Sequence, residues 1–199
     1  MKRCHEEHDK IINEIIDNEW DMFDHVRASE PSACQEHPKA FRLMRWMSHS
    51  VLPTKVLQSY LNDLLKAVQE GRNLITEKYA RMENKIPYGL LNPKIQTIVC
   101  IESEWKELLS DKYPLTIQHG SGDFQKYMAC ELSTYSDETI ELYYEAVMEA
   151  KETNRNLVEE RYANLFKKLG YQSISAREER SRREHEKIIS QNTRIIGAE

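Results

Sequence analysis

The segment Arg72–Tyr88 occurs a second time in the chain as Arg155–Tyr171, and this internal repetition limits the fold to one with two similar halves. Eight of the 17 aligned positions are identical. Repetition of this kind is typical of architectures in which each unit buries its apolar face against its neighbour. We therefore predict internal repeats over residues 9–88 and 94–171, related by a pseudo-twofold axis.

Further matches extend the repeat toward the amino end of each half. They pair Phe41 with Phe124, Tyr60 with Tyr143 and, after a shift of two residues, Glu19-Trp20 with Glu104-Trp105. Loops of different length in the two halves would absorb the shift of two residues.

Apolar residues recur every three or four positions, which is the period of an amphipathic helix. Residues 9–27 show it most clearly, with Ile12, Ile15, Ile16 and Phe23 on one face. The pattern predicts further helices over 38–50, 54–84, 94–110, 123–132 and 137–169. The expected fold is all-α: a helical bundle of two tandem three-helix repeats within a single domain, 1–199. A charged helix over 175–192 is expected in the C-terminal tail, 172–199.

Composition excludes several functional classes. The net charge is −5 and the pI is about 5.9, which disfavours nucleic-acid binding. No apolar run is long enough for a transmembrane helix. The four cysteines form no Cys-x-x-Cys pair. Reduced thiols in a cytoplasmic protein are the expectation.

Four carboxylates are candidate functional groups. Glu19 lies on the apolar stripe of its helix, where a charge is costly unless it is paired or neutralised. Its predicted repeat partner, Glu104, lies beside Ile101 and Leu108. Glu77 and Glu160 follow at matching places in the repeated segment.

If the two halves face each other, these four carboxylates would converge as the ligands of a divalent metal ion, as in helical-bundle metal sites. The chain lacks the Glu-x-x-His motif that such sites usually include, so a metal cofactor is not favoured. The simpler interpretation is that each Glu pairs with a neighbouring Arg, Lys or Trp and fixes a helix contact.

The predicted helix 54–84 carries a second set of polar candidates. This set is dense in hydrogen-bonding groups, and its members are Tyr60, Asp63, Arg72, Asn73, Glu77 and Lys78; Arg72 is suited to clamping an anion. Such a set is able to bind a small zwitterion or a phosphate. The alternative is a solvated helix face with ion pairs one turn apart.

A third candidate is the loop thiol of Cys34. With His37, His25 or His49 as a base it would serve as a nucleophile. An isolated loop cysteine is more often inert.

Several segments together resemble the bacterial family known as domain of unknown function 4125, and the resemblance covers nearly the whole chain. They are Glu19-Trp20-Asp21-Met22-Phe23, Ala33-Cys34-Gln35, Met44-Arg45, Ser59-Tyr60, Asp63-Leu64, Gly71-Arg72-Asn73-Leu74, Glu77-Lys78-Tyr79-Ala80, Lys112-Tyr113-Pro114 and Glu131-Leu132-Ser133-Thr134-Tyr135-Ser136.

The resemblance implies no activity, because this family has none assigned. In some relatives the domain stands beside a nucleotidyltransferase-like domain, which implies an accessory or recognition role. The chain departs from the family pattern where Glu30-Pro31-Ser32 replaces a glycine–arginine pair and where His49 replaces a glutamine.

Two functional classes therefore stay open. One is a small enzyme acting on a polar metabolite between the halves, with Glu19, Tyr60, Asp63 and Glu77 as catalytic candidates. Arg72, Asn73, Arg45 and Cys34 would be its binding residues. The other is a non-catalytic helical module that binds a ligand or a protein partner. An enzyme should enclose a pocket with at least one carboxylate that lacks a basic partner.

Overall fold

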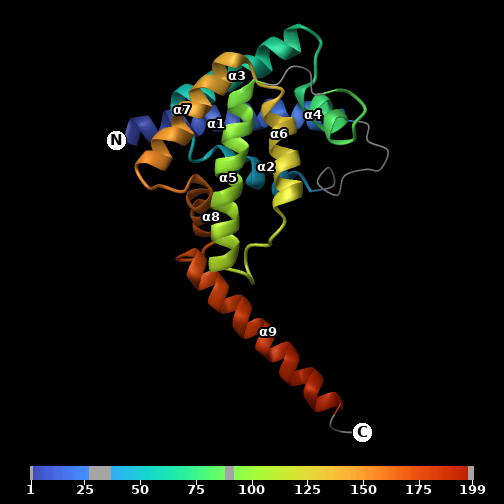
Figure 1. The fold of residues 1–199 in the computed structure, drawn as a ribbon, viewed down its shortest axis with the longest axis vertical. Helices are drawn as coiled ribbons and strands as arrows, with labels where there is room; N and C mark the ends of the chain where they lie inside the picture. Colours follow the sequence, from blue (N-terminus) through green and yellow to red (C-terminus); the bar gives the residue numbers. More distant parts are fainter. Residues whose placement is uncertain (1, 27–36, 88–91, 197–199) are drawn as a thin grey trace.

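The computed structural model describes residues 2–26, 37–87 and 92–196, and in this part of the chain every regular element is an α-helix (Figure 1). The all-α prediction is confirmed. The helices are α1 (Lys2–Asp24), α2 (Pro38–His49), α3 (Thr54–Gln69), α4 (Leu74–Met82), α5 (Pro93–Lys112), α6 (Ser121–Leu132), α7 (Asp137–Glu152), α8 (Leu157–Lys168) and α9 (Ile174–Ile196).

The prediction of single long helices over 54–84 and 137–169 is wrong, because each of these segments is two helices. In the first, Gly71 adopts a φ of 67°, and the Asn73 side chain accepts a hydrogen bond from Thr76 N at 2.8 Å. In the second, Asn154 has a φ of 55° and Asn156 caps α8. A left-handed residue ends a helix, and an asparagine N-cap starts the next one. Each half therefore contains four helices, α1–α4 and α5–α8, and not three.

Equivalent contacts occur in both halves at a constant separation of 83 positions. Asn73 Nδ2 donates to Met22 O at 2.8 Å, and Asn156 Nδ2 donates to Trp105 O at 3.2 Å. These bonds tie α4 to α1 and α8 to α5. At this separation Glu19 corresponds to Glu102. The predicted two-residue shift, which paired Glu19 with Glu104, is therefore wrong.

The apolar stripe of α1 forms the centre of the first half. Ile12, Ile15, Ile16 and Phe23 are buried, as their spacing predicts. Helix α1 packs on α2, α3 and α4, while α5 packs on α6, α7 and α8. The halves meet where α2 packs on α8, α3 on α7 and α4 on α6. Burial of apolar area along these contacts stabilises the bundle, at about 25 cal/mol per Å².

Helix α9 leaves the bundle after its first turns (Figure 1). Ile174 is buried, and the Glu178 carboxylate accepts a hydrogen bond from Leu115 N at 3.1 Å. The residues from Arg182 to Ile189 are exposed. None of the helices in the described part of the chain is both long and apolar enough to cross a membrane.

Candidate functional site

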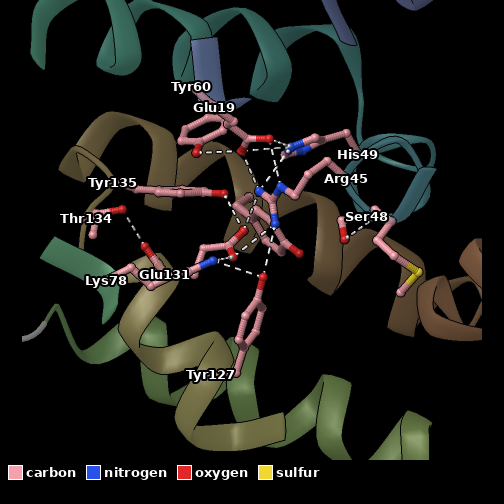
Figure 2. A network of polar contacts seen from close by, with 12 residues as sticks. Glu19, Arg45, Ser48, His49, Tyr60, Lys78, Tyr127, Glu131, Thr134 and Tyr135 are labelled. Atoms are coloured by element: carbon pink, nitrogen blue, oxygen red, sulfur yellow. Dashed lines mark hydrogen bonds and ion pairs between the residues drawn. The ribbon is translucent and has the colours of Figure 1, made fainter. Parts of the chain in front are cut away.

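A buried charge cluster centred on Arg45 connects the two halves (Figure 2). The Arg45 guanidinium on α2 donates from Nε and Nη2 to both carboxylate oxygens of Glu19 on α1, at 2.7 and 2.5 Å. Its Nη1 and Nη2 donate to the two oxygens of Glu131 on α6, at 3.1 and 2.9 Å. One guanidinium thus bridges a carboxylate of each half, with the planar geometry that favours Arg over Lys.

Tyrosine and lysine side chains complete the cluster. Tyr60 OH on α3 donates to Glu19 at 2.9 Å, and Tyr135 OH donates to Glu131 at 3.3 Å. Lys78 Nζ on α4 donates to Glu131 at 3.1 Å and to Tyr127 OH at 3.0 Å. We call this group the Arg45 cluster, and its members are Glu19, Arg45, His49, Tyr60, Lys78, Tyr127, Glu131 and Tyr135.

The helical period explains how single helices deliver these groups. Glu19 lies one turn after Ile15 and one turn before Phe23, so it points into the core and is fully buried. Arg45 and His49 are one turn apart on the buried face of α2. His49 Nε2 lies 3.2 Å from Glu19 Oε1, so α2 presents two polar groups to the same carboxylate.

Charge balance makes this burial tolerable, because two carboxylates face one guanidinium and one ammonium. Burial alone would raise the pKa of Glu19, but the charges of Arg45 and His49 and their hydrogen bonds lower that pKa to about 2. For Glu131, burial is likewise outweighed by Arg45 and Lys78, so its pKa lies well below the usual range. Burial and the charge of Glu19 raise the pKa of Tyr60.

A second buried cluster lies within the second half. Arg161 on α8 donates to both oxygens of Glu102 on α5, from Nη2 at 3.0 Å and from Nη1 over a shorter distance. Arg161 Nη2 also donates to Tyr143 OH at 2.7 Å, and Tyr143 OH donates to Glu102 at 2.9 Å. Glu102, Tyr143 and Arg161 form the Arg161 cluster, in which the single carboxylate is again paired.

A small cavity of about 70 Å³ separates the two clusters. Its walls include His49, Glu131 and Tyr135 from the Arg45 cluster and Glu102 and Arg161 from the other. A water molecule occupies about 30 Å³ of liquid volume, so the space suits roughly two waters and not a metabolite.

A larger cleft of about 730 Å³ opens between the halves. Helices α1, α2 and α3 form one side, with His8, Trp46 and Thr54, and helices α7 and α8 form the other, with Glu149 and Lys168. Leu52 lines both this space and the small cavity. We call the larger space the inter-half cleft, and its volume lies in the range of small-molecule sites.

The structure brings only some of the predicted site residues together. Glu19, Tyr60 and Arg45 meet in the Arg45 cluster. Asp63 accepts hydrogen bonds from Ser136 N and Thr139 Oγ1, at 3.0 and 2.6 Å, and so holds the start of α7. Cys34 lies outside the described residues.

Arg72, Asn73 and Glu77 form contacts near the surface that stabilise the local structure. Arg72 donates to Glu77 twice, both times at 2.9 Å, while Asn73 caps α4. Arg155 and Glu160 form the same pair in the second half, at 2.8 Å.

The four predicted metal ligands do not assemble. Glu19 is buried against Arg45, Glu77 and Glu160 form ion pairs with arginines, and Glu104 is exposed. Among the residues that the structure describes, no three histidine, cysteine, aspartate or glutamate side chains are grouped to hold a metal ion.

Sequence reasoning missed Glu131, Glu102 and Arg161 as members of the buried clusters, and it named Lys78 only among the polar groups of the predicted helix 54–84. A strict separation of 83 would have identified Glu102 from Glu19 and Arg161 from Lys78. Glu131 corresponds to Ser48 and Arg45 to Met128, so the pair that crosses the halves breaks the repeat. This departure from the repeat was the sequence feature that could have identified the pair.

Comparison with known proteins gives one match. Residues 9–179 match the family described as "Protein of unknown function (DUF4125)". No curated protein matches the chain, and no solved structure matches it.

Proposed function

The chain belongs to the DUF4125 family, whose description names no activity, and we propose from its geometry that it is a non-catalytic helical module that binds a small polar molecule in the inter-half cleft. The observation that carries this proposal is a space of about 730 Å³ between two sets of helices that are tied together beside it. Ligand sites commonly lie between helices of bundles and are largely pre-formed.

Hydrogen bonds fix the walls of the cleft. His8 Nε2 lies 2.9 Å from Leu52 O, which joins α1 to the loop before α3. Asn164 Nδ2 of α8 donates to Ser50 Oγ at 3.1 Å, which joins the halves directly. Trp46 lies next to Arg45 on α2, so the Arg45 cluster holds the helix that presents this ring to the cleft. Binding would then require little reorganisation of the protein.

Charge pairing and exposure favour binding over catalysis, because Glu19, Glu131 and Glu102 are paired, and the unpaired carboxylates that line the cleft, Asp9 and Glu149, are exposed. An acid–base enzyme needs a carboxylate whose proton affinity is free to change, and unpaired buried groups supply it. The buried carboxylates of Glu19, Glu131 and Glu102 each face a guanidinium, so they act as fixed counter-ions. The enzyme hypothesis, with Glu19, Tyr60, Asp63 and Glu77 as catalytic residues, gains no free base from this arrangement.

The proposal also explains why a cleft lies between the two sets of helices. We infer that α1–α4 and α5–α8 are tandem repeats of one four-helix unit, facing each other within a single cytoplasmic domain. The equivalent asparagine caps and Arg–Glu pairs at a separation of 83 support this inference. In such an arrangement the space between the repeats is the natural place for a ligand.

Filling the cleft tests the proposal. Thr54→Trp places a large ring at an exposed position on the cleft wall, and Gln58→Trp, on the same helix but outside the cleft, is the matched control. Small metabolites that raise the melting temperature of the wild type should raise that of Q58W equally and that of T54W far less. Equal shifts in both variants would place binding elsewhere and contradict the proposal.

A further inference from the structure

The charges that line the inter-half cleft point to the class of its ligand. Lys167 and Lys168 of α8 line this space, and within the described side chains neither forms an ion pair, while Lys168 Nζ lies over the Trp46 ring, 3.8 Å from its centre. Asp9 and Glu149 contribute two carboxylates that also lack an ion-pair partner there. Arg155 is occupied, because Glu160 holds it. The available charges are thus two of each sign.

We propose that the cleft binds a short peptide with free termini, or a zwitterion of similar length, with its anionic group at Lys167 and Lys168 and its cationic group toward Glu149. This inference rests on the proposed binding function of the same cleft. A ligand with only one charge would leave the opposite pair of cleft charges unused.

The order of the charges along α8 supports this orientation. The cleft is lined by α8 from Leu157, in its first turn, to Lys168, in its last. At 1.5 Å per residue these two residues are about 16 Å apart along the helix axis. Glu149 belongs to the first end, because it lies in the last turn of α7, which ends at Glu152, shortly before α8 begins at Leu157. The lysines belong to the other end.

The length of the cleft suits about three residues. An extended tripeptide is about 10 Å long. The flexible side chains of lysine and glutamate, reaching inward from both ends, span the remaining distance. At the lysine end the wall offers the Trp46 ring, with Lys168 Nζ 3.8 Å from its centre, and the wall also includes the polar groups of Ser50 and Asn164. This mixture of ring face and amide partners matches a peptide backbone with small side chains.

Calorimetric titration with trialanine, N-acetyl-trialanine and trialanine amide tests the inference on the full chain. Trialanine should bind, and removal of either terminal charge should weaken binding up to about fivefold, as for an exposed ion pair. In the double variant Lys167→Ala/Lys168→Ala, the acid and the amide should bind equally. In Asp9→Asn/Glu149→Gln, the free and acetylated peptides should bind equally. Lys151→Ala, an exposed lysine of α7 outside the cleft, is the control and should preserve both differences.

The outcomes separate this inference from the proposed function. If all three peptides bind with the same affinity, or if the lysine variant still prefers the acid, the charge assignment is overturned. If no peptide binds but other small molecules bind in a manner that T54W abolishes, the peptide inference fails and the binding function stands. If nothing binds in a T54W-sensitive manner, both fail.

Discussion

Replacing Arg45 by methionine would remove the cation that lies between two buried carboxylates. Methionine is flexible enough to fill the space of the arginine stem without adding a polar group. Glu131 would keep Lys78 as a partner, at 3.1 Å. Glu19 would keep only the contacts with His49 and Tyr60. The variant therefore isolates the cost of leaving Glu19 buried without its guanidinium.

The expected loss follows from burial. Glu19 is 0% exposed, and four hydrogen bonds join Arg45 to the two carboxylates. Removing one member of a buried ion pair costs about 3–5 kcal/mol, because the remaining charge is uncompensated. In a chain of this size each kcal/mol lowers the melting temperature by about 2–4 °C, which makes the total roughly 6–20 °C.

The dependence of stability on pH should differ in direction between the wild type and R45M. In the wild type the pKa of Glu19 is lowered from 4.5 to about 2, so its stabilising contribution is complete above pH 4.5 and is lost as the pH falls toward 2. Without Arg45, burial should raise that pKa above its ordinary value, so R45M should gain stability as the pH falls from 7 toward 5. The difference in unfolding free energy between wild type and R45M should therefore shrink on acidification.

Urea unfolding at pH 7 and pH 4.5 measures both effects. Arg42→Met, one turn earlier on the same helix, is the matched control, because Arg42 and its partner Asp17 are 45% and 60% exposed. An exposed pair contributes about 0–1 kcal/mol. If R45M were no less stable than R42M, or if its deficit grew on acidification, the account of the cluster would be refuted.

Three further changes test other parts of the structure. Tyr60→Phe removes a hydrogen bond to the charged Glu19 and should lower the free energy of unfolding in urea by about 1.5–3 kcal/mol. A decrease of less than about 0.5 kcal/mol would show that the hydroxyl does not stabilise the carboxylate. Asn156→Ala removes the cap of α8 and the bond to Trp105 O, so about 1–3 kcal/mol should be lost, whereas Asn62→Ala on the exposed face of α3 should cost little. Addition of Mg²⁺, Mn²⁺ or Zn²⁺ or of a chelator should leave the melting temperature unchanged, and a saturable shift with any of these ions would restore the metal hypothesis.

Local periodicity was sufficient to place Glu19 correctly. Its position on the apolar stripe of α1 predicted burial, and the cost of a buried charge predicted a basic partner. Arg45 is that partner. Glu77 also has the basic neighbour that the simpler interpretation predicts, Arg72, but this pair lies at the surface because no apolar stripe directs Glu77 inward.

The breaks in the two long predicted helices show how a local signal can be masked. Asn73 and Asn156 are good N-caps and each follows a short run of polar residues, but the apolar period resumes after each run, so the pattern resembles that of one continuous helix. The backbone turns at Gly71 and Asn154, where the left-handed conformation ends the preceding helix. The repeated Arg-Asn-Leu has the same structural contacts at both places, an asparagine cap and an Arg–Glu pair.

The periodicity of apolar residues cannot predict which side chains pair over long distances in the sequence. Arg45 and Glu131 are far apart in the sequence and meet only because α2 and α6 converge between the halves. The inter-half cleft likewise depends on how α8 packs against α2. Neither the spacing of Lys167 and Lys168 nor that of Asp9 and Glu149 indicates a common space.

The indole N–H signals of the three tryptophans provide the most direct test of ligand binding between the halves. Trp46 lines the cleft, whereas Trp105 is buried in the core and Trp20, which does not line the cleft, packs against the core. In ¹⁵N-labelled protein titrated with a panel of small polar molecules, a ligand of the cleft should shift the Trp46 signal in a saturable manner and leave those of Trp20 and Trp105 in place. A panel that leaves Trp46 unmoved, or that shifts only the other two signals, would contradict the account.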